Sequence, residues 1–302
     1  MFCSLFLFFF SLVFADSFMT TFGECTLEIY GGEVDDIPEF VQLIQDETEN
    51  LTREFGQLQL RPFSVYITSN MKDFLEKSKG PIPEWGIAIA KTKPDRIILK
   101  APHIANISFT RMNEVIIHEL NHIYMFRLPN YGTLPSWFKE GMAMRSANEF
   151  SLIHKIEISR SIWKKQTIPL QRLRNISTYS RDKVKLAYGE SAAAVEALEF
   201  YYGKDVLINL ITNLHHDQDF EEALEIVMGE EIIDFQIKFE LYLEANFSWI
   251  FFLRSSRYIY IILPFILVLG FIYHRYRSKK ILRQWEIEDE LENRSWNEEF
   301  PN

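Results

Sequence analysis

The pentapeptide His118-Glu119-Leu120-Asn121-His122 constrains this chain more than any other feature, because it has the pattern HExxH. Residues four positions apart lie on one face of an α-helix, so His118 and His122 can present imidazole nitrogens to a single ion. Glu119 is rotated by about 100° around the helix and stands beside that ion as a base. The pentapeptide therefore predicts a helix that supplies two metal ligands and one base.

A third ligand is required, because a catalytic zinc ion keeps three protein ligands and leaves the fourth position to water. Glu140 is the candidate. Residues 128–134 contain the Pro, Asn and Gly of a tight loop, and Pro135 suits the first turn of a second helix. The pattern therefore predicts a helical hairpin that returns Glu140 over the two histidines. The alternative interpretation is a surface helix on which these side chains are only solvated.

The two motifs resemble those of the gluzincin metallopeptidases, and in particular the peptidase MA-like group. Members of that group carry a similar histidine helix, followed by a helix like residues 135–143, which read Pro-Ser-Trp-Phe-Lys-Glu-Gly-Met-Ala. Weaker similarity continues in order through residues 168–173, 187–192 and 220–224. The resemblance therefore covers about residues 25–245.

The resemblance implies an α+β, zincin-like catalytic domain with a small N-terminal sheet, an active-site helix and a helical C-terminal part. It implies a peptidase in which His118, His122 and Glu140 bind Zn²⁺ and Glu119 is the general base. Zinc lowers the pKa of bound water from about 15.7 toward 7 and polarises the scissile carbonyl. Glu119 can then accept a proton near neutral pH.

One departure from the family concerns the group that orients the first histidine. In thermolysin-like relatives an aspartate four positions beyond the ligand glutamate does so, and this chain has Met144 there. Asn113, Glu114 and Glu149 are available substitutes, and the sequence does not choose among them. Such partners typically change metal affinity or activity 10- to 100-fold.

The oxyanion formed during peptide hydrolysis needs a hydrogen-bond donor besides zinc. Tyr188 is the candidate, because it is expected to begin a helix and similar peptidases place a tyrosine or histidine on that flank. The alternative interpretation is a core or capping tyrosine. His154, His215 and His216 are further candidates without positional support.

Both ends of the chain predict membrane targeting. Residues 2–15 form an apolar run typical of a secretory signal peptide, so residues 1–15 are interpreted as that signal. No Lys or Arg precedes the run, which leaves an uncleaved anchor or a misassigned start as alternatives. A juxtamembrane segment, residues 247–257, is followed by an apolar run at 258–274, which predicts one transmembrane helix. A buried core helix is the alternative.

The flanking charges predict an orientation. Basic residues are more numerous after the apolar run than before it, so the positive-inside bias places the acidic tail, residues 275–302, in the cytoplasm. The metallopeptidase domain, residues 16–246, would then be extracytoplasmic. The formal net charge is −10, and the sequence shows no clustered Lys and Arg in the globular part, which argues against a nucleic-acid partner. The expected partners are a peptide or protein substrate and the lipid bilayer.

Periodicity predicts the elements around the motif. Apolar residues at helical spacing predict a helix at 36–56. Strand-like patterns of apolar and polar residues predict strands at 63–68 and 96–100. In gluzincins the strand before the active-site helix pairs with extended substrate, so residues 96–100 are expected to do so, with an ordinary sheet strand as the alternative. Helices dominate from residue 187 onward, with Gly203 and Gly229 as stops.

Three functional classes are compared. The sequence favours a membrane-anchored, extracytoplasmic zinc metallopeptidase. A catalytically silent relative that binds zinc or serves as a scaffold would have no use for Glu119. An intramembrane protease is disfavoured, because Arg111, Asn113 and Glu114 make the motif helix too polar for lipid.

Overall fold

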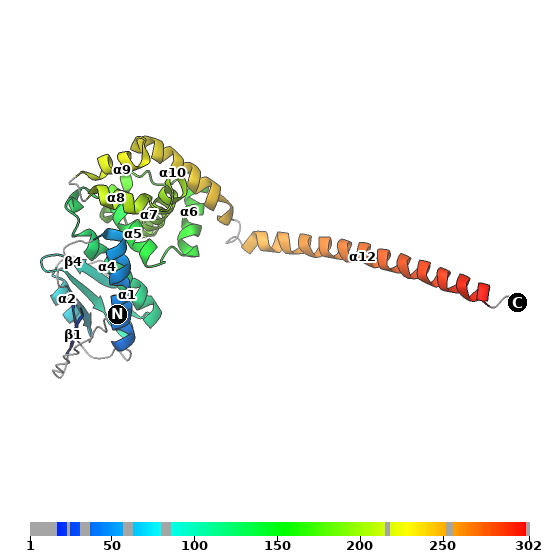
Figure 1. Ribbon diagram of the computed structural model, residues 1–302, viewed down its shortest axis with the longest axis horizontal. Coiled ribbons are helices and arrows are strands. Elements are labelled where there is room, and N and C mark those ends of the chain that lie inside the picture. The colour runs from blue at the N-terminus through cyan, green and yellow to red at the C-terminus, as the bar shows by residue number, and fades with distance from the viewer. Residues whose placement is uncertain are drawn as a thin grey trace, which may run out of the picture. The chain divides into compact units, whose positions relative to one another are not determined.

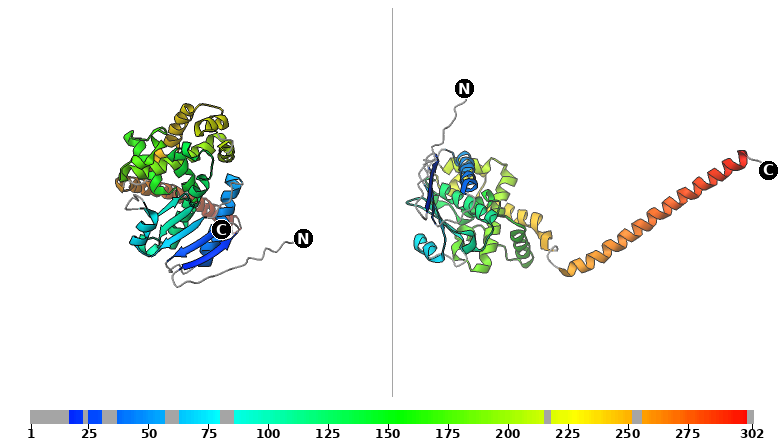
Figure 2. Two further views of the ribbon diagram at one scale, coloured as in Figure 1. Left: turned by 90° about the vertical axis from the view of Figure 1, so that its left-hand side faces the viewer. Right: turned by 90° about the horizontal axis from the view of Figure 1, so that it is seen from below.

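The structure is a computed structural model that describes residues 17–22, 25–30, 37–56, 63–79, 86–214, 218–251 and 256–299 (Figure 1). The chain divides into two compact units, Met1–Ser248 and Trp249–Asn302. The predicted signal segment, residues 1–15, lies outside the described residues. Within the first unit, the strands gather on one side and helices α7 to α10 on the other (Figure 2).

Five short strands make up the described β-structure. Strands β1 (Ser17–Phe22) and β2 (Cys25–Tyr30) form an antiparallel pair. Strands β3 (Ser64–Thr68), β4 (Ala88–Lys91) and β5 (Arg96–Lys100) form a sheet in the order β3-β5-β4. Strand β5 runs parallel to β3 and antiparallel to β4. Its apolar residues are fully buried, as expected for the central strand of a covered sheet: Ile97, Ile98 and Leu99.

This order corrects one expectation about substrate binding. Residues 96–100 form the predicted strand, but they are hydrogen-bonded to β3 on one side and to β4 on the other. A strand with both edges paired has no backbone groups left for a substrate. Strands β3 and β4 lie at the two edges of this sheet, and β4 is the edge strand that contacts α4 (Phe109–Met125), the helix of the HExxH motif.

The predicted helix at 36–56 is confirmed as α1 (Ile37–Phe55). It buries an apolar stripe that packs on α4: Phe40, Ile44, Leu51 and Phe55. The Tyr124 hydroxyl at the end of α4 donates a hydrogen bond to the Thr48 carbonyl at 3.1 Å. Two shorter helices follow strands of this sheet in the sequence: α2 (Met71–Ser78) comes after β3, and α3 (Pro102–Ala105) comes after β5. The motif helix is therefore held between α1 and the sheet.

The rest of the first unit is helical. Its elements are α5 (Ser136–Ser146), α6 (Leu152–Lys164), α7 (Arg181–Tyr202), α8 (Val206–Leu214), α9 (Phe220–Met228) and α10 (Ile232–Phe247), with short 3₁₀ turns η1 (Tyr131–Thr133), η2 (Arg172–Arg174) and η3 (Ile176–Thr178). Gly203 and Gly229 end α7 and α9 at positive φ, as predicted. The expectation that Tyr188 begins a helix is wrong, because α7 begins at Arg181 and Tyr188 lies inside it.

The second unit consists of η4 (Ser248–Ile250), which begins at the boundary, and the long helix α12 (Ser256–Glu299), which contains the apolar run 258–274. Every large apolar side chain from Ile262 to Tyr273 is at least 48% exposed. No helix in the described part of the chain is both long enough and apolar enough to cross a membrane. The side chains of residues 258–261, where the predicted span begins, lie outside the described part.

Candidate metal centre and active site

Helix α4 presents the motif residues because its opposite face is buried. Ser108 caps the helix, its side chain accepting a hydrogen bond from the Arg111 amide at 3.1 Å. The buried face of α4 includes Met112, Ile116, Leu120 and Ile123. His118, Glu119 and His122 keep partial exposure on the other side. The amphipathic pattern of α4 thus fixes which way the histidines point.

The predicted helical hairpin is confirmed. The chain leaves α4 at Phe126, passes through η1 and enters α5, with Pro135 as the residue just before the helix rather than in its first turn. Trp137 and Phe138 are buried and pack against Phe220, with ring centroids 5.6 and 5.0 Å from it. This aromatic cluster fixes the start of α5, and Glu140 follows within one turn.

The hairpin brings the three predicted ligands together. The Nε2 atoms of His118 and His122 are 3.2 Å apart, and Oε2 of Glu140 lies 3.5 and 3.6 Å from them. Within the described residues, these three side chains form the one cluster that could hold a metal ion. Burial alone would raise the pKa of Glu140, but the two histidines outweigh it and hold that pKa well below its usual range.

The geometry of this triangle fits zinc. Tetrahedral Zn²⁺ binds imidazole nitrogen and carboxylate oxygen at about 2.0 to 2.2 Å, which separates neighbouring ligand atoms by roughly 3.3 Å. The three observed separations lie close to that value. Two imidazoles and a carboxylate are also a donor set that zinc prefers in catalytic sites. The site is therefore a zinc site.

Glu149 supplies the contact to His118 that the sequence left open. Its Oε2 lies 2.8 Å from Nδ1 of His118, and its Oε1 lies 2.7 Å from the Arg111 guanidinium. Burial raises the pKa of Glu149, but His118 and Arg111 outweigh it and lower that pKa. Met144, which replaces the family's aspartate, is buried. Glu149, five positions beyond Met144, thus orients His118.

The turn after α5 explains how Glu149 reaches the site. Asn148 adopts φ 52, the left-handed conformation that ends many helices, and the Glu149 amide donates to the Met144 carbonyl at 2.9 Å. This turn folds the chain back toward α4. An asparagine directly after a helical pattern is a sequence signal for such a turn, and it favours Glu149 over Asn113 and Glu114. Glu114 instead pairs with Arg111 at 2.6 Å.

Glu119 lies between the metal site and the edge strand. Burial raises the pKa of its carboxyl group, while His122 and His118 act in the opposite direction. The backbone of Ala90, in β4, also lowers the pKa. The carboxylate is thus held beside both the ligand cluster and the strand that can bind a peptide backbone.

Tyr188 reaches the same site from α7. Burial raises the pKa of its hydroxyl far above the usual range, and Glu140, Glu119 and Glu149 raise it further. Because Glu140 acts on the hydroxyl in this way, the hydroxyl lies close to the metal ligands. A phenol with such a pKa stays protonated and can donate a hydrogen bond.

The other predicted donors are not equivalent to Tyr188. His154 lines the same cavity, but its Nδ1 lies 3.1 Å from the Ser151 hydroxyl in the capping box of α6. His215 and His216 lie outside the described residues.

A cavity of about 350 Å³ lies beside the metal ligands. Its walls include His118, Glu119 and Tyr188, together with Ala88 at the start of β4 and the two residues before it, Gly86 and Ile87. A volume of this size accommodates a few residues of a peptide. Glu119, Tyr188 and the edge strand β4 thus border one cavity.

The family match covers this whole arrangement. The sequence model of the Peptidase MA superfamily matches residues 44–245, about two thirds of the chain. This protein belongs to the peptidase MA superfamily. The matched stretch contains every element that carries the site, from β4 to α7. The resemblance drawn from the two motifs is therefore confirmed as family membership.

Solved structures of low sequence identity also match. The M1 zinc metallopeptidase from Deinococcus radiodurans matches with 13% identity and a TM-score of 0.45, over 72% of this chain and 48% of that one. A mutant of that enzyme bound to a Tyr-Ser-Ala substrate matches with 13% identity and a TM-score of 0.44, with the same coverage. The chain thus spans about half the length of these structures. No curated protein matches the sequence.

Proposed function

We propose that this member of the peptidase MA superfamily is a zinc peptidase that hydrolyses peptide bonds with Glu119 as general base. One observation carries the proposal. His118, which forms the ligand triangle with His122 and Glu140, lines a cavity whose walls also include Glu119, Tyr188 and the first residue of the edge strand β4. A zinc site that served only to stabilise the fold would need neither the base nor the free edge.

The residues of the chain have distinct roles in this reaction. Zinc bound by the three ligands supplies a Lewis acid for the scissile carbonyl and lowers the pKa of the attacking water. Glu119 accepts a proton from that water and passes it to the leaving amine. The Tyr188 hydroxyl donates a hydrogen bond to the oxygen that becomes negative in the transition state. Glu149 keeps His118 in the orientation that points Nε2 at the metal.

The substrate backbone is held by β4. An edge strand carries free N–H and C=O groups that can pair with an extended peptide. Residues 86–88 line the cavity beside Glu119, so a peptide paired there passes the base. This proposal replaces the expectation that residues 96–100 bind the substrate.

The proposal includes a single membrane anchor. Residues 2–15 would direct the chain to the membrane and residues 258–274 would cross it, with the catalytic unit extracytoplasmic and residues 275–302 in the cytoplasm. The exposed apolar side chains of α12 support this, since ten large ones lie between Ile262 and Tyr273. An exposed apolar surface of this kind requires lipid or a protein partner. Removal of residues 258–302 should release the protein from the membrane fraction on carbonate extraction, and a variant that stayed bound would contradict the anchor.

Peptide hydrolysis tests the catalytic part of the proposal. The full-length protein, purified in detergent, should cleave members of a fluorogenic peptide library, and a chelator should abolish cleavage until zinc is returned. Glu119→Gln should bind zinc and cleave nothing. If no peptide were cleaved by a wild-type protein that holds zinc, the scaffold alternative would replace the peptidase.

A further inference from the structure

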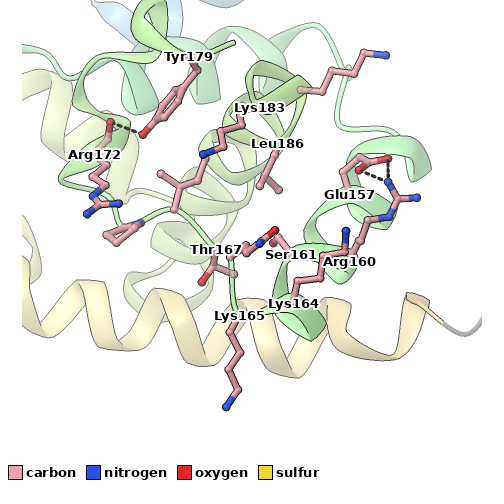
Figure 3. A pocket seen from close by; sticks show the side chains of 14 residues that line it. Glu157, Arg160, Ser161, Lys164, Lys165, Thr167, Arg172, Tyr179, Lys183 and Leu186 are labelled. Atoms are coloured by element: carbon pink, nitrogen blue, oxygen red, sulfur yellow. Dashed lines mark hydrogen bonds and ion pairs between the residues drawn. The ribbon is translucent and has the colours of Figure 1, made fainter. Parts of the chain in front are cut away.

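A second cavity, of about 790 Å³, lies beside the catalytic one and is strongly basic. It is formed by the C-terminal part of α6, the loop that follows and the start of α7 (Figure 3). Six of its fourteen lining residues are Lys or Arg and one is acidic. This contrasts with the formal net charge of −10 for the whole chain. The chain thus concentrates positive charge at one hollow of an otherwise acidic protein.

Most of these cations lack an acidic partner. The single acid, Glu157, pairs with Arg160 at 2.9 Å. Among the described side chains, Lys164, Arg172 and Lys183 form no ion pair. Figure 3 shows Lys165 pointing away from the other labelled side chains, so it adds little to the cavity. Unpaired cations around a concave surface focus a positive potential that attracts anions.

Lys185 connects the basic cavity to the catalytic one, because it lines both. It lies three residues before Tyr188 on α7. Lys183 precedes Tyr188 by five residues, which is about 7.5 Å along the helix axis. An extended peptide advances about 3.3 Å per residue, so Lys183 lies two to three peptide residues away from Tyr188. A substrate that leaves the catalytic cavity along the start of α7 enters the basic one.

We infer that this cavity is a substrate subsite for acidic side chains, which selects peptides carrying Glu or Asp two to four residues to one side of the cleaved bond. The inference rests on the proposed function and specifies its substrate class. Lys164 and Lys183 approach the carboxylates from α6 and α7, and Lys185 lies at the passage between the two cavities. The positive end of the α7 dipole, at the first turn that holds Lys183, adds to the attraction.

Matched peptides test this inference. The full-length zinc-loaded protein would be given fluorogenic peptides in pairs that differ only by Glu-Glu or Gln-Gln, placed two to four residues on either side of the central bond. We expect kcat/KM to favour the Glu-Glu member about tenfold on one side, with the preference falling as salt rises. A combined Lys164→Glu and Lys183→Glu variant should bring the ratio to one or below.

Controls separate this inference from its alternatives. Lys204→Glu, an exposed residue outside both cavities, should keep the wild-type ratio. A wild-type ratio of one, or a ratio unchanged in the double variant, would overturn the inference. A double variant that keeps its peptide preference but loses its binding to phosphatidylserine vesicles would also overturn the inference, because the cavity would then be a lipid site. If no peptide is cleaved at all, the proposed function fails, and anisotropy of the labelled peptides on Glu119→Gln still tests the subsite.

Discussion

Nδ1 of His118 lies 2.8 Å from Oε2 of Glu149, and this contact connects α4 to the turn that follows α5. One nitrogen of the imidazole faces the metal ligands and the other faces the carboxylate. The contact fixes the ring orientation and increases the basicity of the ligand nitrogen. Arg111 holds the other oxygen of Glu149, so the carboxylate is itself positioned.

Replacing Glu149 should weaken zinc binding. Glu149→Gln keeps the size of the side chain but removes the charge that supports His118, so we expect the zinc affinity to fall about 10- to 100-fold. Competition with a chromophoric chelator measures this affinity. Glu114→Gln is the matched control, because Glu114 also contacts Arg111 but not His118. An affinity unchanged by Glu149→Gln would exclude the orienting role.

Replacing Tyr188 should affect turnover and leave zinc in place. Tyr188→Phe removes the hydroxyl that donates to the developing oxyanion, so we expect kcat to fall about 10²- to 10³-fold. Tyr201→Phe on the same helix is the control, because its hydroxyl donates to the Lys238 carbonyl outside the catalytic cavity. Steady-state kinetics on one cleaved peptide give kcat and KM for each variant. A normal kcat for Tyr188→Phe would assign the tyrosine to packing.

Gly141, next to the ligand Glu140, should tolerate no side chain. A Cβ atom there would lie 2.4 Å from the Ser191 carbonyl and 2.6 Å from Cγ2 of Val195, so α5 and α7 would have to separate. We expect Gly141→Ala to destabilise the fold by about 1 to 3 kcal/mol and to weaken zinc binding by displacing Glu140. Chemical denaturation and metal content measure the two effects. Gly132→Ala is the control, because no atom lies within 4 Å of its added Cβ.

Glu190 should make the stability of the fold dependent on pH. Burial raises its pKa to about 8, although the Ile168 amide and the Ser161 hydroxyl donate to its carboxylate and partly offset this. A carboxyl group whose pKa is higher in the folded state binds its proton more tightly there. Its contribution to stability is therefore complete below about pH 4.5 and is lost as the pH rises through about 8.

The matched variant isolates this effect. The wild-type free energy of unfolding should fall by on the order of a few kcal/mol between pH 5 and pH 9. The Glu190→Gln side chain cannot titrate, so the variant should not show this fall. Urea denaturation across that range measures the free energy of unfolding. Glu222→Gln, an exposed residue of α9, should leave the wild-type dependence intact. If wild type and Glu190→Gln showed the same slope, Glu190 would not be the titrating group.

Local patterns predicted the part of the site that depends on nearby residues. The helix with His118 and His122, the hairpin and Glu140 all lie within one supersecondary unit, whose periodicity and loop residues are visible in the sequence. Glu149 was left open among three candidates, although Asn148 is a sequence signal for the left-handed turn that brings Glu149 to the site. The family resemblance suggested Tyr188, which does line the cavity, but the residue pattern wrongly placed it at the start of a helix instead of inside α7.

Features that depend on distant pairing were predicted less well. Strand β5 was expected to bind substrate, but strand order decides which edge is free, and sequence periodicity does not encode strand order. The basic cavity could not be predicted either, because no single run of basic residues in the sequence forms it. Its cations come from α6, a loop and α7, which meet only after folding.

The most direct test of the zinc site is metal stoichiometry coupled to hydrolysis. Mass spectrometry on the full-length protein should find about one zinc per chain in wild type and in Glu119→Gln, and much less in His118→Ala and Glu140→Ala. Peptide cleavage should be present in wild type alone. A folded wild-type protein without zinc, or a Glu119→Gln variant that cleaves peptides at the wild-type rate, would contradict this account.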